Sequence, residues 1–124
     1  MNKTVELILR WLVGILLVVF GANKFFNFMP SPPLEGDLAT FFTGLIASKY
    51  MMPLVGLVEI LVGLLFILKK WVPFALVLLA PVSVNMVLTH VFMDPMNIAP
   101  AAFVFLINVV LIYVYWNKFK QLFD

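Results

Sequence analysis

Residues 51–68 read MMPLVGLVEILVGLLFIL, an apolar segment with a single ionisable side chain, Glu59. The segment is close to the roughly 20 residues that a helix needs to cross the hydrocarbon core of a bilayer. A charged side chain is costly at that depth, and one that occurs there usually faces the interior of a helix bundle or a functional site. The segment therefore predicts a membrane-spanning helix, with Glu59 as a candidate functional residue.

The composition of the whole chain supports a membrane protein. Of the 124 residues, 65% are hydrophobic and 11% are charged, whereas a soluble domain has about half apolar and about a quarter charged residues. A chain of this size has too little interior to bury so much apolar surface, so we expect lipid to cover it. The absence of cysteine excludes disulfides and thiolate metal sites. The net charge of +2 does not indicate nucleic-acid binding.

Three further apolar segments have the length of a membrane span, at about residues 5–28, 72–93 and 98–116. The first is longer than the apolar region of a cleavable signal peptide and has no small-residue cleavage site after it. Between the first two spans, residues 38–48 place apolar side chains at helical spacing, and Asp37 is a typical helix cap. This pattern predicts a short amphipathic helix in the membrane interface. The expected fold is all-α: one domain over residues 1–124, an integral membrane four-helix bundle with an interfacial helix between spans one and two.

The basic residues predict the orientation of the bundle. If four spans alternate in direction, six of the eight Lys and Arg residues fall at one end. The positive-inside rule places this end, with both termini, in the cytoplasm, and the 28–50 segment and the Asp94–Pro95 turn outside. The six residues are Lys3, Arg10, Lys69, Lys70, Lys118 and Lys120.

Polar side chains within the spans are predicted to form two layers. Glu59, Asn85 and Asn108 come from three different spans and lie roughly 12–15 Å from the outer ends, at 1.5 Å per residue. A second layer lies nearer the outer interface. The candidate ligand-binding residues of the two layers are Asn23, Lys24, Glu59, Asn85, His90, Asp94 and Asn108. Glu59 and His90 are also the candidate proton carriers.

Helical spacing predicts which faces of the first two spans meet. Gly56, Glu59 and Gly63 share one face of the second span. The corresponding stripe of the first span comprises Arg10, Gly14, Leu17, Gly21 and Lys24. Because glycines let neighbouring helices approach closely, we expect the two stripes to pack together and to direct Lys24 toward the level of Glu59. Three partners stay open for Lys24: Glu59, a bound ligand or the lipid headgroups.

Other residues carry more local expectations. Pro81 should kink the third span one turn before Asn85 and open a cavity at that depth. Arg10 should extend to the cytoplasmic interface. With one histidine and no cysteine, a metal or haem site within one chain is not expected. The methionines of the outer half, such as Met51 and Met52, suit ordinary packing or the lining of a cavity for a flat apolar ligand.

Four motifs in this order resemble the DoxX family of small bacterial four-helix membrane proteins: G-x-N-K-F at 21–25, G-x-x-E-x-x-x-G at 56–63, P-x-x-x-N at 81–85 and H-x-x-x-D-P at 90–95. The resemblance implies four transmembrane helices in the bacterial inner membrane. It also implies a redox association, because related proteins include a subunit of an archaeal thiosulfate:quinone oxidoreductase and some members are linked to redox complexes. The residues that match the family's pattern are Asn23, Lys24, Glu59, Asn85, His90 and Asp94.

Two functions follow from these observations. The first is a redox-associated subunit that binds a quinone or a similar apolar ligand in an outward-facing polar pocket, as an accessory subunit of a membrane oxidoreductase. Its partners would be the lipid bilayer and a membrane or periplasmic redox protein, or a second copy of the chain. The second is a structural membrane subunit that docks a partner and has no chemistry of its own. Small-solute transport is less favoured, because no chain of charges crosses the bundle.

Overall fold

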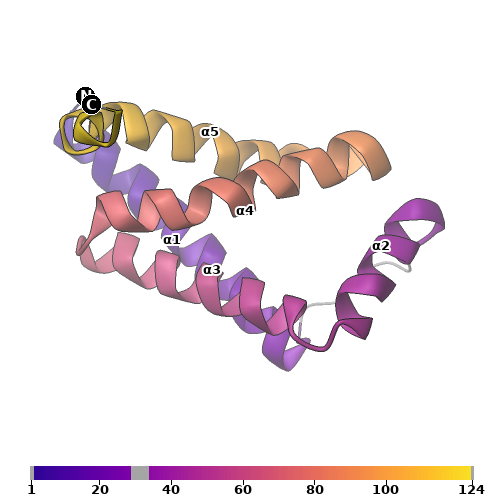
Figure 1. Ribbon diagram of the computed structural model, residues 1–124. Coiled ribbons are helices and arrows are strands. Elements are labelled where there is room, and N and C mark those ends of the chain that lie inside the picture. The colour runs from indigo at the N-terminus through magenta and orange to yellow at the C-terminus, as the bar shows by residue number, and fades with distance from the viewer. Residues whose placement is uncertain (1, 29–33, 124) are drawn as a thin grey trace.

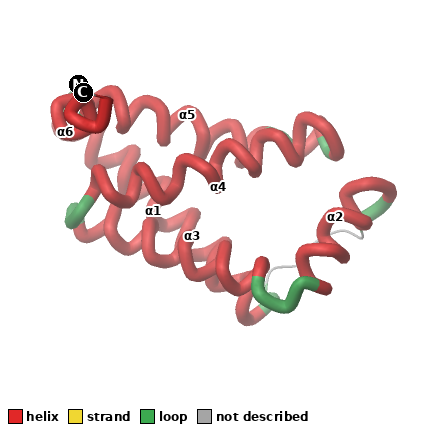
Figure 2. The backbone as a smooth tube through the Cα atoms, in the orientation of Figure 1, coloured by secondary structure: helices red, strands yellow, loops and turns green. Residues whose placement is uncertain are grey.

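The computed structural model describes residues 2–28 and 34–123, which form helices and short connections and contain no strand. Figure 1 shows the arrangement of the helices, and Figure 2 shows how little of the described chain lies in loops. The elements are α1 (Lys3–Phe26), α2 (Gly36–Ala47), α3 (Met51–Leu68), α4 (Val72–Met93), the 3-10 turn η1 (Pro95–Asn97), α5 (Ala99–Val114), α6 (Trp116–Phe119) and the 3-10 turn η2 (Lys120–Phe123). The all-α prediction is confirmed.

Three of these helices, α1, α3 and α4, are long and apolar enough to cross a membrane, and their bounds lie within two residues of the predicted spans. The fourth predicted span, residues 98–116, corresponds to α5, which is 16 residues long and also begins and ends within two residues of the prediction. After α5 the chain bends by 78° into the segment Trp116–Phe123. The bend buries Phe119 against the core, stacks the ring of Trp116 on that of Phe123, and leaves Lys118 exposed. The amphipathic end of the chain thus turns across the end of the bundle instead of extending α5.

The helices pack as two pairs that diverge. α1 packs along α3, and α4 packs against both α3 and α5. In Figure 1 the pairs α1–α3 and α4–α5 are close at the end that carries both termini and the α3–α4 loop, and they spread apart toward the other end, where α2 lies. The core is at the close end and draws on all four long helices. It includes Val13, Leu17, Val62, Phe66, Leu76, Leu79, Val104 and Leu111.

Glycines bring α1 and α3 into backbone contact. A Cβ atom added at Gly21 would lie 2.6 Å from the main-chain oxygen of Gly56. One added at Gly63 would lie 2.6 Å from the main-chain oxygen of Gly14. Both distances are too short for any side chain, so only glycine permits this approach. The predicted packing of the two glycine stripes is confirmed.

The start of α2 differs from the prediction. Asp37 was expected to cap this helix, but Glu35 occupies the position before the first turn and makes no side-chain capping hydrogen bond. Gly36 has φ +64, which glycine adopts without strain, so the helix begins two residues earlier than predicted. Asp37 lies in the first turn, where its carboxylate faces the positive end of the helix dipole.

Candidate functional site

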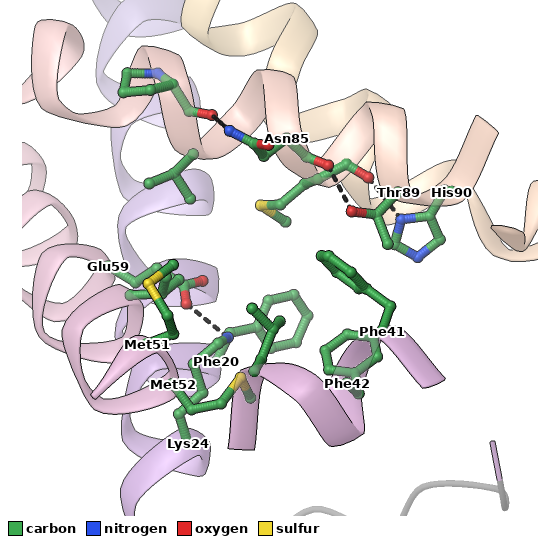
Figure 3. A pocket seen from close by; sticks show the side chains of 15 residues that line it. Phe20, Lys24, Phe41, Phe42, Met51, Met52, Glu59, Asn85, Thr89 and His90 are labelled. Carbon is green, nitrogen blue, oxygen red and sulfur yellow. Dashed lines mark hydrogen bonds and ion pairs between the residues drawn. The ribbon is translucent and has the colours of Figure 1, made fainter. Parts of the chain in front are cut away.

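A cavity of about 420 Å³ lies where the two helix pairs diverge. Side chains of α1, α2, α3 and α4 line it, and Figure 3 shows them around the cavity. Its volume falls within the range of about 300–1,000 Å³ that is usual for small-molecule sites. The prediction of a cavity near Pro81 and Asn85 is confirmed, since both residues line it. Pro81 does not divide α4, which runs from Val72 to Met93 as one helix.

An ion pair between α1 and α3 forms one side of the cavity. Lys24 Nζ lies 2.6 Å from Glu59 Oε1, and the two side chains are 22% and 1% exposed. A Cβ atom at Gly56 would lie 3.1 Å from Lys24 Cβ, so the glycine makes room for the lysine stem. The structure therefore identifies Glu59 as the partner of Lys24. Glu59 Oε2 is buried and has no hydrogen-bond partner within the described residues.

Three polar side chains of α4 lie on the opposite side of the cavity (Figure 3). Each bonds to a main-chain carbonyl one turn earlier on its own helix. Asn85 Nδ2 donates to Pro81 O over 2.8 Å, and Thr89 Oγ1 donates to Asn85 O over 2.7 Å. His90 Nδ1 lies 2.8 Å from Met86 O. These bonds lie within α4 and orient the three side chains.

The bonds also determine what the α4 side chains can offer a ligand. A carbonyl oxygen can only accept, so Nδ1 of His90 carries the hydrogen and Nε2 of the neutral ring is an acceptor. The hydroxyl of Thr89 donates its hydrogen to Asn85 O, and its oxygen can still accept a hydrogen bond. Asn85 retains its Oδ1 as an acceptor and the second hydrogen of Nδ2 as a donor.

Apolar side chains complete the cavity. Phe41 and Phe42 of α2 pack edge to face, with ring centroids 5.6 Å apart, and both line the cavity. Met51 and Met52 line it from the start of α3. The amphipathic helix between spans one and two is therefore also a wall of the cavity, a role that its sequence did not indicate.

Asn108 does not join Glu59 and Asn85 as the common depth of the three residues suggested. Its side chain is buried between α4 and α5, where Oδ1 accepts from Ser83 Oγ over 2.9 Å and Nδ2 donates to Leu76 O over 3.3 Å. Depth along a helix does not determine the direction in which a side chain points. Asn108 points into the α4–α5 contact instead of the cavity.

Two other candidates lie beside the cavity and not on its wall. Asp94 ends α4, and both of its carboxylate oxygens accept from Asn97 Nδ2 over 3.0 Å. It therefore orders the turn into η1. Asn23 is half-buried on α1, next to Lys24, and does not line the cavity. Of the seven predicted ligand-binding residues, the cavity brings together Lys24, Glu59, Asn85 and His90.

A second polar cluster, at the other end of the bundle, was missed. Arg10 was expected to extend to the interface, but it is 3% exposed and donates through Nη1 to Phe66 O over 2.6 Å. Its Nε lies 3.5 Å from Glu6 Oε1, and the hydroxyl of Tyr115 donates to the same carboxylate. The signal was present, because Arg10 shares the stripe of Gly14, which faces α3.

Comparison with known proteins assigns a family to this arrangement. The sequence model of the DoxX family matches residues 5–94, which include α1 from its third residue, α2 to α4 and the residues that line the cavity. No curated protein and no solved structure matches the chain. Because the match covers well over half of the chain, and the helices are those of a membrane protein, this chain belongs to the DoxX family.

Proposed function

We propose that this protein is a redox-associated membrane subunit that binds a quinone, or a similar flat apolar ligand, in the cavity between α1–α3 and α4. The observation that carries the proposal is the combination of aromatic and methionine walls with polar groups on two facing sides. Phe41 and Phe42 offer faces and edges to a ring, and methionine adapts to its shape. Polar groups in such a cavity orient the ligand.

The polar groups suit the chemistry of a quinone. Reduction of a quinone to a quinol takes up two electrons and two protons, and oxidation of the quinol releases them. Lys24 has three N–H donors and shares one with Glu59, which leaves donors for an oxygen of the ligand. Glu59 and His90 would give or take the protons. The electrons would be exchanged with a partner redox protein in or beside the membrane.

The position of the cavity supports access from the outer half of the bilayer. Both termini and the Lys69–Lys70 loop lie at one end of the bundle, and α2 and the cavity lie toward the other (Figure 1). The positive-inside rule places the first end in the cytoplasm of the bacterial cell, so the ligand would enter from the outer leaflet of the inner membrane.

Thermal unfolding of the purified protein in lipid nanodiscs, with decylubiquinone or menadione added, tests the proposal. A ligand at a concentration of about 100 times Kd stabilises the folded state by roughly 2.7 kcal/mol, so the melting temperature should rise with ligand concentration. Val55→Phe, which fills the cavity from α3, should remove the effect. Leu57→Phe, on an exposed face of the same helix, should retain it. If neither the quinones nor their reduced quinol forms stabilise the native protein at saturation, the proposal is wrong.

A structural subunit without its own chemistry is the second candidate, because the Lys24–Glu59 pair also ties α1 to α3. Glu59→Gln separates the two functions. If the variant folds, assembles and leaves the activity of a partner complex unchanged, the carboxylate is structural. If it folds but loses ligand binding, the ligand-binding function is supported.

A further inference from the structure

We propose that the cavity prefers the reduced, hydroxyl-bearing form of its aromatic ligand, a quinol or another phenol, over the oxidised carbonyl form. The inference rests on the proposed ligand-binding function and concerns the chemical form that binds. It follows from the balance of hydrogen-bond donors and acceptors that the described residues present to the cavity.

The first acceptor is the buried carboxylate of Glu59. Its side chain is 1% exposed, one oxygen contacts Lys24, and Oε2 has no hydrogen-bond partner within residues 2–28 and 34–123. A buried anionic oxygen without a donor is costly, and the cost is recovered when a ligand supplies an O–H group. A quinone carbonyl cannot do this, because it has no hydrogen to donate.

Two further acceptors face the carboxylate from α4. Met86 O holds the hydrogen of His90 on Nδ1, so Nε2 of the neutral ring presents a lone pair. Thr89 donates its hydroxyl hydrogen to Asn85 O, so its oxygen is left to accept. Each of these bonds lies within α4, so none of them requires a contact with another helix or with a ligand.

The charged donor on the cavity wall is Lys24, which is already engaged with Glu59. A ligand hydroxyl can accept from the Lys24 ammonium and donate to Glu59 Oε2 at the same time. A second hydroxyl, on the far side of the ring, can donate toward His90. A quinone can accept from Lys24 and from the second N–H of Asn85 Nδ2, but it leaves Glu59 Oε2 and His90 Nε2 without a donor. Because one hydrogen bond to a charged group contributes about a factor of ten or more in affinity, we expect the hydroquinone to bind at least about tenfold more tightly than the quinone.

Three ligands with the same ring test the inference: trimethylhydroquinone, trimethyl-1,4-benzoquinone and the dimethyl ether of the hydroquinone. Their stabilisation of the protein in nanodiscs is measured anaerobically over a range of concentrations. The hydroquinone should act at concentrations at least about tenfold lower than the other two. Equal or tighter binding of the quinone overturns the inference and leaves the proposed function intact. Binding of none of the three counts against the proposed function itself.

Variants test whether Glu59 and His90 cause the preference for the hydroquinone over the quinone. Glu59→Gln replaces an acceptor with an amide that can donate, and His90→Phe removes Nε2, so each should lower the ratio of hydroquinone to quinone affinity. The matched control is Asn97→Ala, which alters an exposed polar residue outside the cavity and should keep the ratio. Among residues 2–28 and 34–123, His90 bonds to the main chain of its own helix, so His90→Phe should fold even if Glu59→Gln does not. An unchanged ratio in His90→Phe, together with an unchanged ratio in Glu59→Gln where that variant folds, overturns the inference.

Discussion

Lys24 Nζ on α1 lies 2.6 Å from Glu59 Oε1 on α3, with the carboxylate almost fully buried and the lysine beside the cavity. The contact of Gly21 with Gly56 brings the two helices together next to this pair. The same ion pair therefore ties the helices together and forms one side of the cavity. Loss of the ion pair should therefore lower the stability of the bundle and should also weaken ligand binding, and the two effects can be measured independently.

Lys24→Met should strongly destabilise the protein, because it leaves the Glu59 carboxylate buried without its cation. Breaking a buried ion pair by removing one partner typically costs about 3–5 kcal/mol. Combining it with Glu59→Met should recover most of the loss, since the double variant buries no charge. Denaturant or thermal unfolding in nanodiscs measures both. Additive losses in the double variant would show that the two side chains do not interact.

Gly63→Ala should destabilise the α1–α3 contact, because the new Cβ would lie 2.6 Å from the main-chain oxygen of Gly14. Overpacking of this kind costs about 1–3 kcal/mol. The matched control is Gly44→Ala in α2, where an added Cβ has no atom within 4 Å. There alanine should be neutral or should stabilise by up to about 1 kcal/mol through its helix propensity. Similar effects at both positions would contradict the close packing of α1 on α3.

Arg10→Met should destabilise the end of the bundle that carries both termini, without changing ligand binding at the other end. Its guanidinium donates to Phe66 O near the end of α3, and the carboxylate of Glu6 loses its cation when the guanidinium is removed. A hydrogen bond from a charged group contributes about 1.5–3 kcal/mol. Arg10→Lys should restore only part of this, because an ammonium lacks the planar fork of donors. Unfolding reports the loss, and the quinone-dependent shift should persist in each folded variant.

The orientation can be tested on a chain that contains no cysteine, so a single introduced thiol gives no background labelling. We expect Thr43→Cys, on an exposed position of α2, to react with a membrane-impermeant maleimide in spheroplasts. Lys70→Cys and Lys120→Cys should react only after the membrane is opened. The reverse labelling pattern would place the termini outside and contradict the positive-inside prediction.

Much of the fold could be predicted from the sequence. The lengths of the apolar segments identified three spans to within two residues, because the bilayer sets the length of a helix. The spacing of the glycines identified the faces on which α1 and α3 meet, because residues three and four apart share a helix face. The same spacing placed Lys24 near the level of Glu59. These features depend on distance along a single helix, which the residue numbers supply.

The tertiary structure alone decided which polar groups meet. It paired Lys24 with Glu59, brought the Asn108 side chain to Ser83, and buried Arg10, whose guanidinium donates to Phe66 O. It also placed α2 against the cavity and bent the chain after α5. The physical reason is that the sequence determines the depth of a residue in the bilayer, whereas the direction of its side chain depends on the rotation and tilt of the helix. Rotation and tilt are set by packing between helices, which no single segment determines.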